Sequence, residues 1–224
     1  MMPRMRIVVD LQACQSNASR TRGIGRYSLA LLKAMLRNAG EDEIWVALNG
    51  ELPDTLEPIR AALTGLLPDA RIVVWKAVSA SSAEYPVTAW RRAAAAQARR
   101  AFLESLAPDV VHVSSWFEGF IDDTLTAPGT ATPNYLTAVT VYDLIPLVHA
   151  KAYLEHPRLR EWYLNKAEEL KRADLLLGIS AHTCREAIER LAVPAERVAN
   201  ISAAIDPMFR PLRIDTAESA ALLV

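Results

Sequence analysis

The sequence predicts an α/β fold: a Rossmann-like, doubly wound, mainly parallel sheet of about seven strands with helices on both faces. Short apolar runs alternate along the chain with segments whose apolar residues recur at helical spacing. The apolar runs contain few polar residues, which is typical of strands that are covered on both faces. With 224 residues and 51% hydrophobic content, the chain is long enough to bury a full core as one large domain.

The elements are expected in a regular order. Residues 6–10 form a first strand, and apolar positions in 25–37 recur at helical spacing, which together predict a β-loop-α unit. Short apolar runs predict further strands at 43–48, 71–75, 109–113, 136–142, 175–179 and 198–202. Helical periodicity predicts further helices at 56–67, 88–106, 153–172 and 181–191.

The composition argues against several classes of protein. The chain has 25 basic and 26 acidic residues, and this balance argues against a dominant nucleic-acid-binding surface. Its two cysteines, Cys14 and Cys184, lie far apart without metal-ligand spacing, so neither a disulfide framework nor a zinc site is indicated. The apolar run at 7–9 is too short for a signal peptide or a membrane span. We therefore expect a soluble, cytoplasmic protein.

The strand at 136–142 ends in an aromatic and a carboxylate, Tyr142 and Asp143, shortly before Pro146. Proline cannot donate a hydrogen bond to a neighbouring strand, so the strand is expected to stop here. Open α/β sheets hold their ligands at the carboxyl ends of their strands. Tyr142 and Asp143 are therefore candidate site residues.

The loop before the first helix is a candidate anion site. Gly23 and Gly25 lie just before that helix, with Arg20, Arg22 and Arg26 around them. Glycine backbone, free amides and a helix N-terminus together favour a phosphate group. The three-glycine dinucleotide fingerprint is incomplete here, and no Walker Gly-Lys-Ser/Thr motif follows. The alternative is a loop that uses glycine for close packing, with solvated arginines.

Ser180 follows the strand at 175–179 and is predicted to cap the next helix, a role compatible with a ligand beside it. His182, in the first turn of that helix, is expected at the surface. His112 lies inside an apolar strand and is interpreted as a hydrogen-bonded core histidine or a pocket residue. His149 and His156 flank a helix start and are expected to be solvated.

Four segments together resemble a known family. They are the glycine loop at 22–27, the strand end at 139–146, Gly178 to Ser180, and the closing stretch at 198–211. Their order and spacing, from about residue 5 to 211, resemble the N-terminal domain of a family 4 glycosyltransferase of the GT-B fold.

This resemblance implies two facing Rossmann-like domains. The N-terminal one mainly holds the acceptor and the C-terminal one mainly holds the nucleotide-sugar donor. It implies transfer with retention, with no cofactor and no required metal. Residues 1–211 would form the acceptor-side domain and 212–224 a linker into a donor domain that the sequence does not contain, so the isolated chain should be inactive. The sugar would be mannose or rhamnose, and the acceptor a glycan or lipid-linked glycan of cell-surface polysaccharide such as lipopolysaccharide.

The resemblance also implies residue roles. Gly23 and Gly25 would approach the donor diphosphate, with Arg26 and Ser180 among the ligand-binding residues. Tyr142 and Asp143 would form the cleft floor beside the reacting sugar. Many family members have histidine where this chain has Tyr142, and tyrosine is a poor base at neutral pH. Asp143 is therefore the favoured catalytic residue, holding a substrate hydroxyl.

Three further features allow two interpretations each. Glu161 and Glu169 reproduce a spacing of the family's donor motif, but solvated charges on a helix face explain them better. Arg92 and Arg99 share a helix face that suits either solvent or peripheral contact with the inner face of the cell membrane. The polar stretch at 114–134 is a candidate acceptor lid or a disordered loop. The alternative function is a non-catalytic Rossmann-like domain that binds a phosphorylated or sugar ligand.

Overall fold

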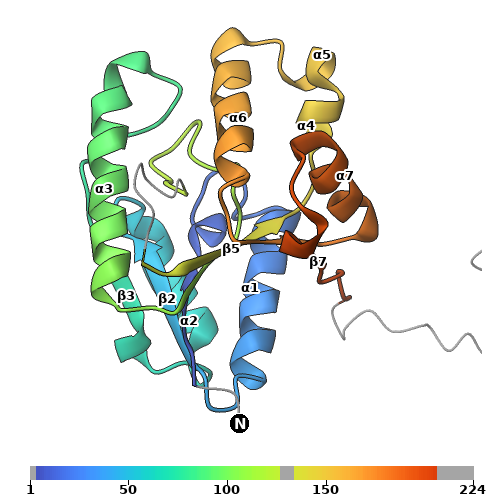
Figure 1. Ribbon diagram of the computed structural model, residues 1–224. Helices are drawn as coiled ribbons and strands as arrows, with labels where there is room; N and C mark the ends of the chain where they lie inside the picture. Colours follow the sequence, from blue (N-terminus) through green and yellow to red (C-terminus); the bar gives the residue numbers. More distant parts are fainter. Residues whose placement is uncertain (1–3, 127–133, 206–224) are drawn as a thin grey trace, which may run out of the picture.

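The computed structural model describes residues 4–126 and 134–205. Within them one sheet of seven parallel strands has the order β3-β2-β1-β4-β5-β6-β7, with helices on both faces (Figure 1). The strands are β1 Arg6–Asp10, β2 Glu43–Asn49, β3 Ile72–Trp75, β4 Val110–Val113, β5 Leu136–Val141, β6 Leu175–Gly178 and β7 Val198–Asn200. The predicted fold class is confirmed, and each strand lies within two residues of its predicted range.

The α-helices are α1 Gly23–Arg37, α2 Leu56–Leu63, α3 Ala89–Ser105, α4 Ile145–Val148, α5 Ala150–Tyr153, α6 Pro157–Leu170 and α7 Ala181–Leu191. Short 3-10 helices are η1 Gln12–Cys14, η2 Pro53–Thr55, η3 Asp69–Arg71, η4 Pro86–Thr88 and η5 Ala195–Arg197. The helix predicted from residue 153 begins at Pro157, because proline suits a first helical position and His156 caps it. The helix predicted to reach 67 ends at Leu63, two residues before Gly65 at φ +78°.

Two cores hold the helices to opposite faces of the sheet. Val8 points into the core that includes side chains of α3, α6 and α7, and Val9 points into the core that includes side chains of α1 and α2. Successive strand residues face opposite sides, so strands that are apolar throughout supply both cores. This arrangement explains why the strands were predictable from uninterrupted apolar runs.

A buried ion pair joins α3 to the carboxyl end of β1. Arg99 Nε donates to Asp10 Oδ2 at 2.8 Å, and Nη2 donates to the same oxygen. Gln12 Nε2 lies 3.0 Å from both oxygens of the same carboxylate. The expectation that Arg99 shares a solvated basic face with Arg92 is therefore wrong, because the Arg99 side chain is only 3% exposed. Arg99 packs inward, where its charge is matched by Asp10.

The order of the strands places a site in the middle of the sheet. β1 and β4 are neighbours, while β2 and β3 lie on one side of them and β5, β6 and β7 on the other. From β1 to β3 successive strands are added on one side, and from β4 to β7 they are added on the other. At such a switch point the loops that follow adjacent strands diverge, leaving a crevice outside the carboxyl ends.

Candidate functional site

Tyr142 joins the end of β5 to the glycine-loop helix α1. Its hydroxyl lies 2.7 Å from Ser28 Oγ and donates to the Ile24 carbonyl at 3.2 Å. Its ring meets Tyr27 edge-on, with centroids 5.6 Å apart. Two segments that the sequence singled out separately, the strand end and the glycine loop, therefore lie against each other at the switch point.

The Tyr142 hydroxyl is a structural donor in this arrangement. Burial raises the pKa of Tyr142 well above its usual value, and the hydrogen bond with Ser28 offsets only part of the rise. The phenol is thus neutral at any physiological pH. Its hydrogen bonds hold α1 against β5, and it offers no base to a substrate.

Asp143, the next residue, is exposed, and its Oδ1 accepts a hydrogen bond from the Ile145 amide at 3.1 Å. It lines a cavity of about 210 Å³ that we call the glycine-loop pocket. The residues of this pocket used below are Arg22, Ile24, Glu118, Tyr142, Asp143 and Tyr163. A carboxylate at this position can accept hydrogen bonds from the hydroxyls of a ligand.

The two glycines of the loop have different surroundings. A Cβ on Gly25 would lie 2.7 Å from the carbonyl oxygens of both Ser19 and Arg20, so this glycine allows the loop to pack onto α1. A Cβ on Gly23 would meet nothing within 4 Å. Gly23 therefore faces open space, where a ligand could approach the helix N-terminus. Gly25 therefore agrees with the close-packing interpretation of the loop, while the anion site at Gly23 stays a prediction.

Arg26 and Ser180 do not line the glycine-loop pocket, whereas Arg22 does. Arg26 is exposed. Ser180 caps α7, accepting from the Thr183 amide at 3.1 Å, and Thr183 Oγ1 in turn donates to the Tyr142 carbonyl at 2.9 Å. The capping role predicted for Ser180 is confirmed, and Ser180 supports the site through the backbone of Tyr142.

Glu118 and Tyr163 are pocket residues that the sequence reasoning missed. Glu118 accepts hydrogen bonds from the hydroxyls of Ser19 and Ser115, the latter at 2.9 Å, but its Oε2 is buried and has no partner among the described residues. Burial raises the pKa of Glu118, and the serine hydrogen bonds lower it in part. The Tyr163 hydroxyl is also buried without a partner in the described part of the chain.

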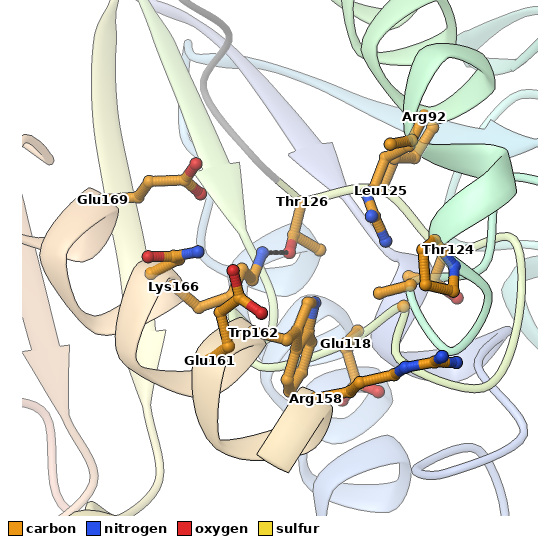
Figure 2. Close-up of a pocket in the computed structure, with 15 residues that line it drawn as sticks. Arg92, Glu118, Thr124, Leu125, Thr126, Arg158, Glu161, Trp162, Lys166 and Glu169 are labelled. Atoms are coloured by element: carbon orange, nitrogen blue, oxygen red, sulfur yellow. Dashed lines mark hydrogen bonds between the residues drawn. The ribbon is translucent and has the colours of Figure 1, made fainter.

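A second cavity lies between α3 and α6, with a volume of about 340 Å³ (Figure 2). We call it the α3–α6 pocket. Its charged wall residues are Arg92, Glu118, Arg158, Glu161, Lys166 and Glu169. Glu118 lines both pockets, so the two cavities are adjacent. Glu161 and Glu169, expected to be merely solvated, both belong to this wall, although Glu161 is exposed and Glu169 pairs with Arg172 at 3.9 Å.

The segment 114–126 is packed between the two helices (Figure 1). Trp116 is 2% exposed and its Nε1 donates to the Lys166 carbonyl at 2.7 Å. Lys166 is itself buried: its Nζ donates to Thr126 Oγ1 and lies 4.5 Å from the Trp116 ring centroid. The described part of the proposed lid is thus a wall of the site, and residues 127–133 lie outside the described residues.

The structure describes the surroundings of all four histidines. His112 is buried, its Nε2 lies 2.8 Å from Thr140 Oγ1, and burial lowers its pKa to about 4. The expectation of a hydrogen-bonded core histidine is confirmed. His149, His156 and His182 are exposed, as predicted.

The described residues, 4–126 and 134–205, contain neither a candidate metal site nor a candidate membrane span. No three His, Cys, Asp or Glu side chains there are grouped so as to hold a metal ion. No helix in the same ranges is both long enough and apolar enough to cross a membrane.

Comparison with known proteins agrees with the geometry. The model of Glycosyltransferase Family 4 matches residues 21–209. An Escherichia coli protein described as serotype-specific mannosyltransferase WbdA is 37% identical over 207 residues, which cover 92% of this chain and 24% of the relative. Two further proteins of that description, also from Escherichia coli, are 35% and 36% identical over 179 residues, 79% of this chain and 22% of each relative. The chain spans about a quarter of the length of these curated relatives.

Proposed function

Because the chain belongs to glycosyltransferase family 4, we propose that it is the acceptor-binding half of a retaining mannosyltransferase that acts in cell-surface polysaccharide synthesis. The donor is a nucleotide sugar and the acceptor is a glycan or lipid-linked glycan. The mannosyltransferase description of the relatives supports the choice of sugar.

One observation carries the proposal. The glycine loop, the end of β5 and the segment after β4 meet around a single pocket at the switch point of the sheet, with Asp143 on its wall. Fold alone does not define activity, but a carboxylate at the carboxyl end of a central strand, beside an open helix N-terminus, suits a substrate that carries both hydroxyls and phosphates.

The residues divide the work as follows. Asp143 accepts a hydrogen bond from a hydroxyl of the reacting sugar or of the acceptor. Tyr142 holds α1 against the end of β5 through its hydrogen bonds to Ser28 and Ile24. The open approach to Gly23 leaves room for the donor diphosphate at the N-terminus of α1, with Arg22 and Arg26 contributing positive charge. No step in this scheme uses a metal bound by the chain.

A donor-binding domain completes the scheme. We propose that residues 1–211 form the acceptor-side domain and that 212–224, which lie outside the described residues, lead toward a second Rossmann-like domain. The chain alone would then fold and bind acceptor without turning over. Cytoplasmic action at the inner face of the membrane, where lipid-linked acceptors are presented, is part of the same proposal.

The test is a transfer assay on the chain joined to its donor-binding domain, with several nucleotide sugars and a mannan-type acceptor. We expect Asp143→Ala to lower kcat by at least tenfold, because an interaction made in the transition state is removed. Tyr142→Phe should act mainly on stability. Glu189→Ala, at an exposed acidic position on α7, is the matched control. Full activity in Asp143→Ala would remove Asp143 from the site.

A further inference from the structure

The α3–α6 pocket contains polar atoms that the fold leaves unpaired. Arg92 Nη1, Glu118 Oε2 and Thr124 Oγ1 are all buried, and none has a hydrogen-bond partner among the described residues. Glu118 is 3% exposed and Thr124 is 2% exposed. An unpaired buried polar group costs about 1–3 kcal/mol. Three of them around one cavity are free to bond with water or with the polar groups of a ligand that enters it.

The charges on the pocket wall select the kind of ligand. The wall carries three basic side chains, Arg92, Arg158 and Lys166, and three acidic ones, Glu118, Glu161 and Glu169, so the two kinds are equal in number around the cavity (Figure 2). A site for a phosphate would instead show an excess of cations. Interspersed carboxylates and guanidinium groups match a neutral ligand with many hydroxyls, because each hydroxyl both donates and accepts hydrogen bonds.

The apolar part of the wall fits the same ligand. Trp162 lines the pocket and is held by Phe120, with ring centroids 5.4 Å apart at 54°. An aromatic ring offers a flat apolar surface to the C–H face of a pyranose. The cavity volume of about 340 Å³ falls within the range of about 300–1,000 Å³ that is usual for small-molecule sites.

We propose that the α3–α6 pocket is a binding subsite for one neutral pyranose residue of the acceptor glycan, distinct from the glycine-loop pocket where Asp143 lies. The subsite rests on the proposed function for its assignment to the acceptor. Glu118 separates the two pockets, lining both. A glycan whose reacting end lies beside Asp143 therefore places an inner sugar within reach of Arg92, Thr124 and Trp162.

The first test measures the binding of methyl α-mannopyranoside and of an α-mannobioside to the 224-residue chain by calorimetry and by NMR chemical shifts. We expect shifts at residues of α6 and of 118–126. Arg92→Met and Trp162→Ala should weaken binding at least tenfold. Arg160→Met, an exposed arginine of α6 outside the pocket, should leave it unchanged.

Thr124→Val separates binding from folding. The substitution replaces an unpaired buried hydroxyl by a methyl group of similar shape, so the variant should be at least as stable as the parent in thermal unfolding. Its affinity for the mannosides should nevertheless fall about threefold or more. Equal affinity in Thr124→Val and the parent would contradict the proposal. So would shifts confined to Tyr142, Asp143 and the glycine loop, or binding of inorganic phosphate at this pocket in place of the mannosides.

A second assay separates this proposal from the function proposed above. In the joined protein, Arg92→Met should raise KM for an oligomannoside acceptor while leaving kcat largely unchanged, whereas Asp143→Ala should lower kcat. If the joined protein transfers no sugar but still binds mannosides at the α3–α6 pocket, the transferase proposal is refuted and the proposed sugar-binding pocket stands. Transfer with an unchanged KM in Arg92→Met would refute the subsite alone.

Discussion

Tyr142 and Asp143 are adjacent in sequence but differ in environment. The Tyr142 hydroxyl is held by Ser28 and Ile24, while Asp143 is exposed on a pocket wall. Consecutive residues at a strand end point in different directions, so one can serve the fold while the other meets the ligand. Sequence identifies both as candidates, and their roles separate only when the partners of each side chain are known.

Gly23 and Gly25 allow a matched test at the residue scale. Gly25→Ala should destabilise the chain by about 2 kcal/mol, since its Cβ would overlap backbone carbonyl oxygens that cannot move easily. Gly23→Ala should be neutral or stabilising by up to about 1 kcal/mol, because its Cβ meets nothing and alanine favours a helix. Chemical denaturation of the two variants measures both effects. Equal stabilities would show that the loop does not pack on α1 as described.

His112 predicts a pH dependence of stability. Its pKa falls from 6.5 to about 4 in the folded chain because burial disfavours the charged ring. The unfolded chain therefore takes up a proton first as the pH drops, and stability is lost between about pH 6.5 and pH 4. The slope should approach about 1.4 kcal/mol per pH unit within that window.

The measurement compares the free energy of unfolding of the parent and of His112→Asn across this range. The variant keeps a polar group near Thr140 but cannot titrate. The free energy of unfolding of the parent minus that of the variant should fall steadily as the pH falls, because only the parent loses the histidine contribution. Parallel curves would mean that the ring is not buried as a neutral group.

At the scale of elements, α3 has nearly its predicted bounds, but Arg99, expected on its solvated face, points inward. Strands were predictable because each is apolar on both faces, and this is a local property of sequence. The direction of Arg99 was not predictable, because a basic residue on a helix is usually solvated and its partner Asp10 lies 89 positions away. The same reason explains why Glu118, inside a polar stretch, gave no signal of burial.

The Asp10–Arg99 pair predicts a strong effect on the attachment of α3. Asp10→Asn removes the carboxylate charge that the buried Arg99 guanidinium binds, so the free energy of unfolding should fall by about 3–5 kcal/mol. The double variant Asp10→Asn with Arg99→Met should cost less than the sum of the two single changes, because it removes both charges. Denaturant titration of the four proteins gives the coupling. Additive effects would show that the two side chains do not interact.

At the scale of the whole molecule, the two pockets and their polar side chains lie next to each other. The glycine-loop pocket lies at the switch point, and the α3–α6 pocket adjoins it through Glu118. The first pocket could be anticipated from the sequence, since strand ends and a glycine loop are local signals. The second could not, because its walls come from α3, α6 and the segment 114–126, and only tertiary packing brings them together.

Division of labour between two domains is the central claim, and calorimetry on the 224-residue chain tests it most directly. The chain is titrated in parallel with an oligomannoside acceptor and with a nucleotide sugar such as GDP-mannose. We predict measurable binding of the acceptor, weakened by Asp143→Ala, and only weak binding of the nucleotide sugar. Tight binding of the nucleotide sugar, with no affinity for the acceptor, would contradict the assignment of this chain to the acceptor side.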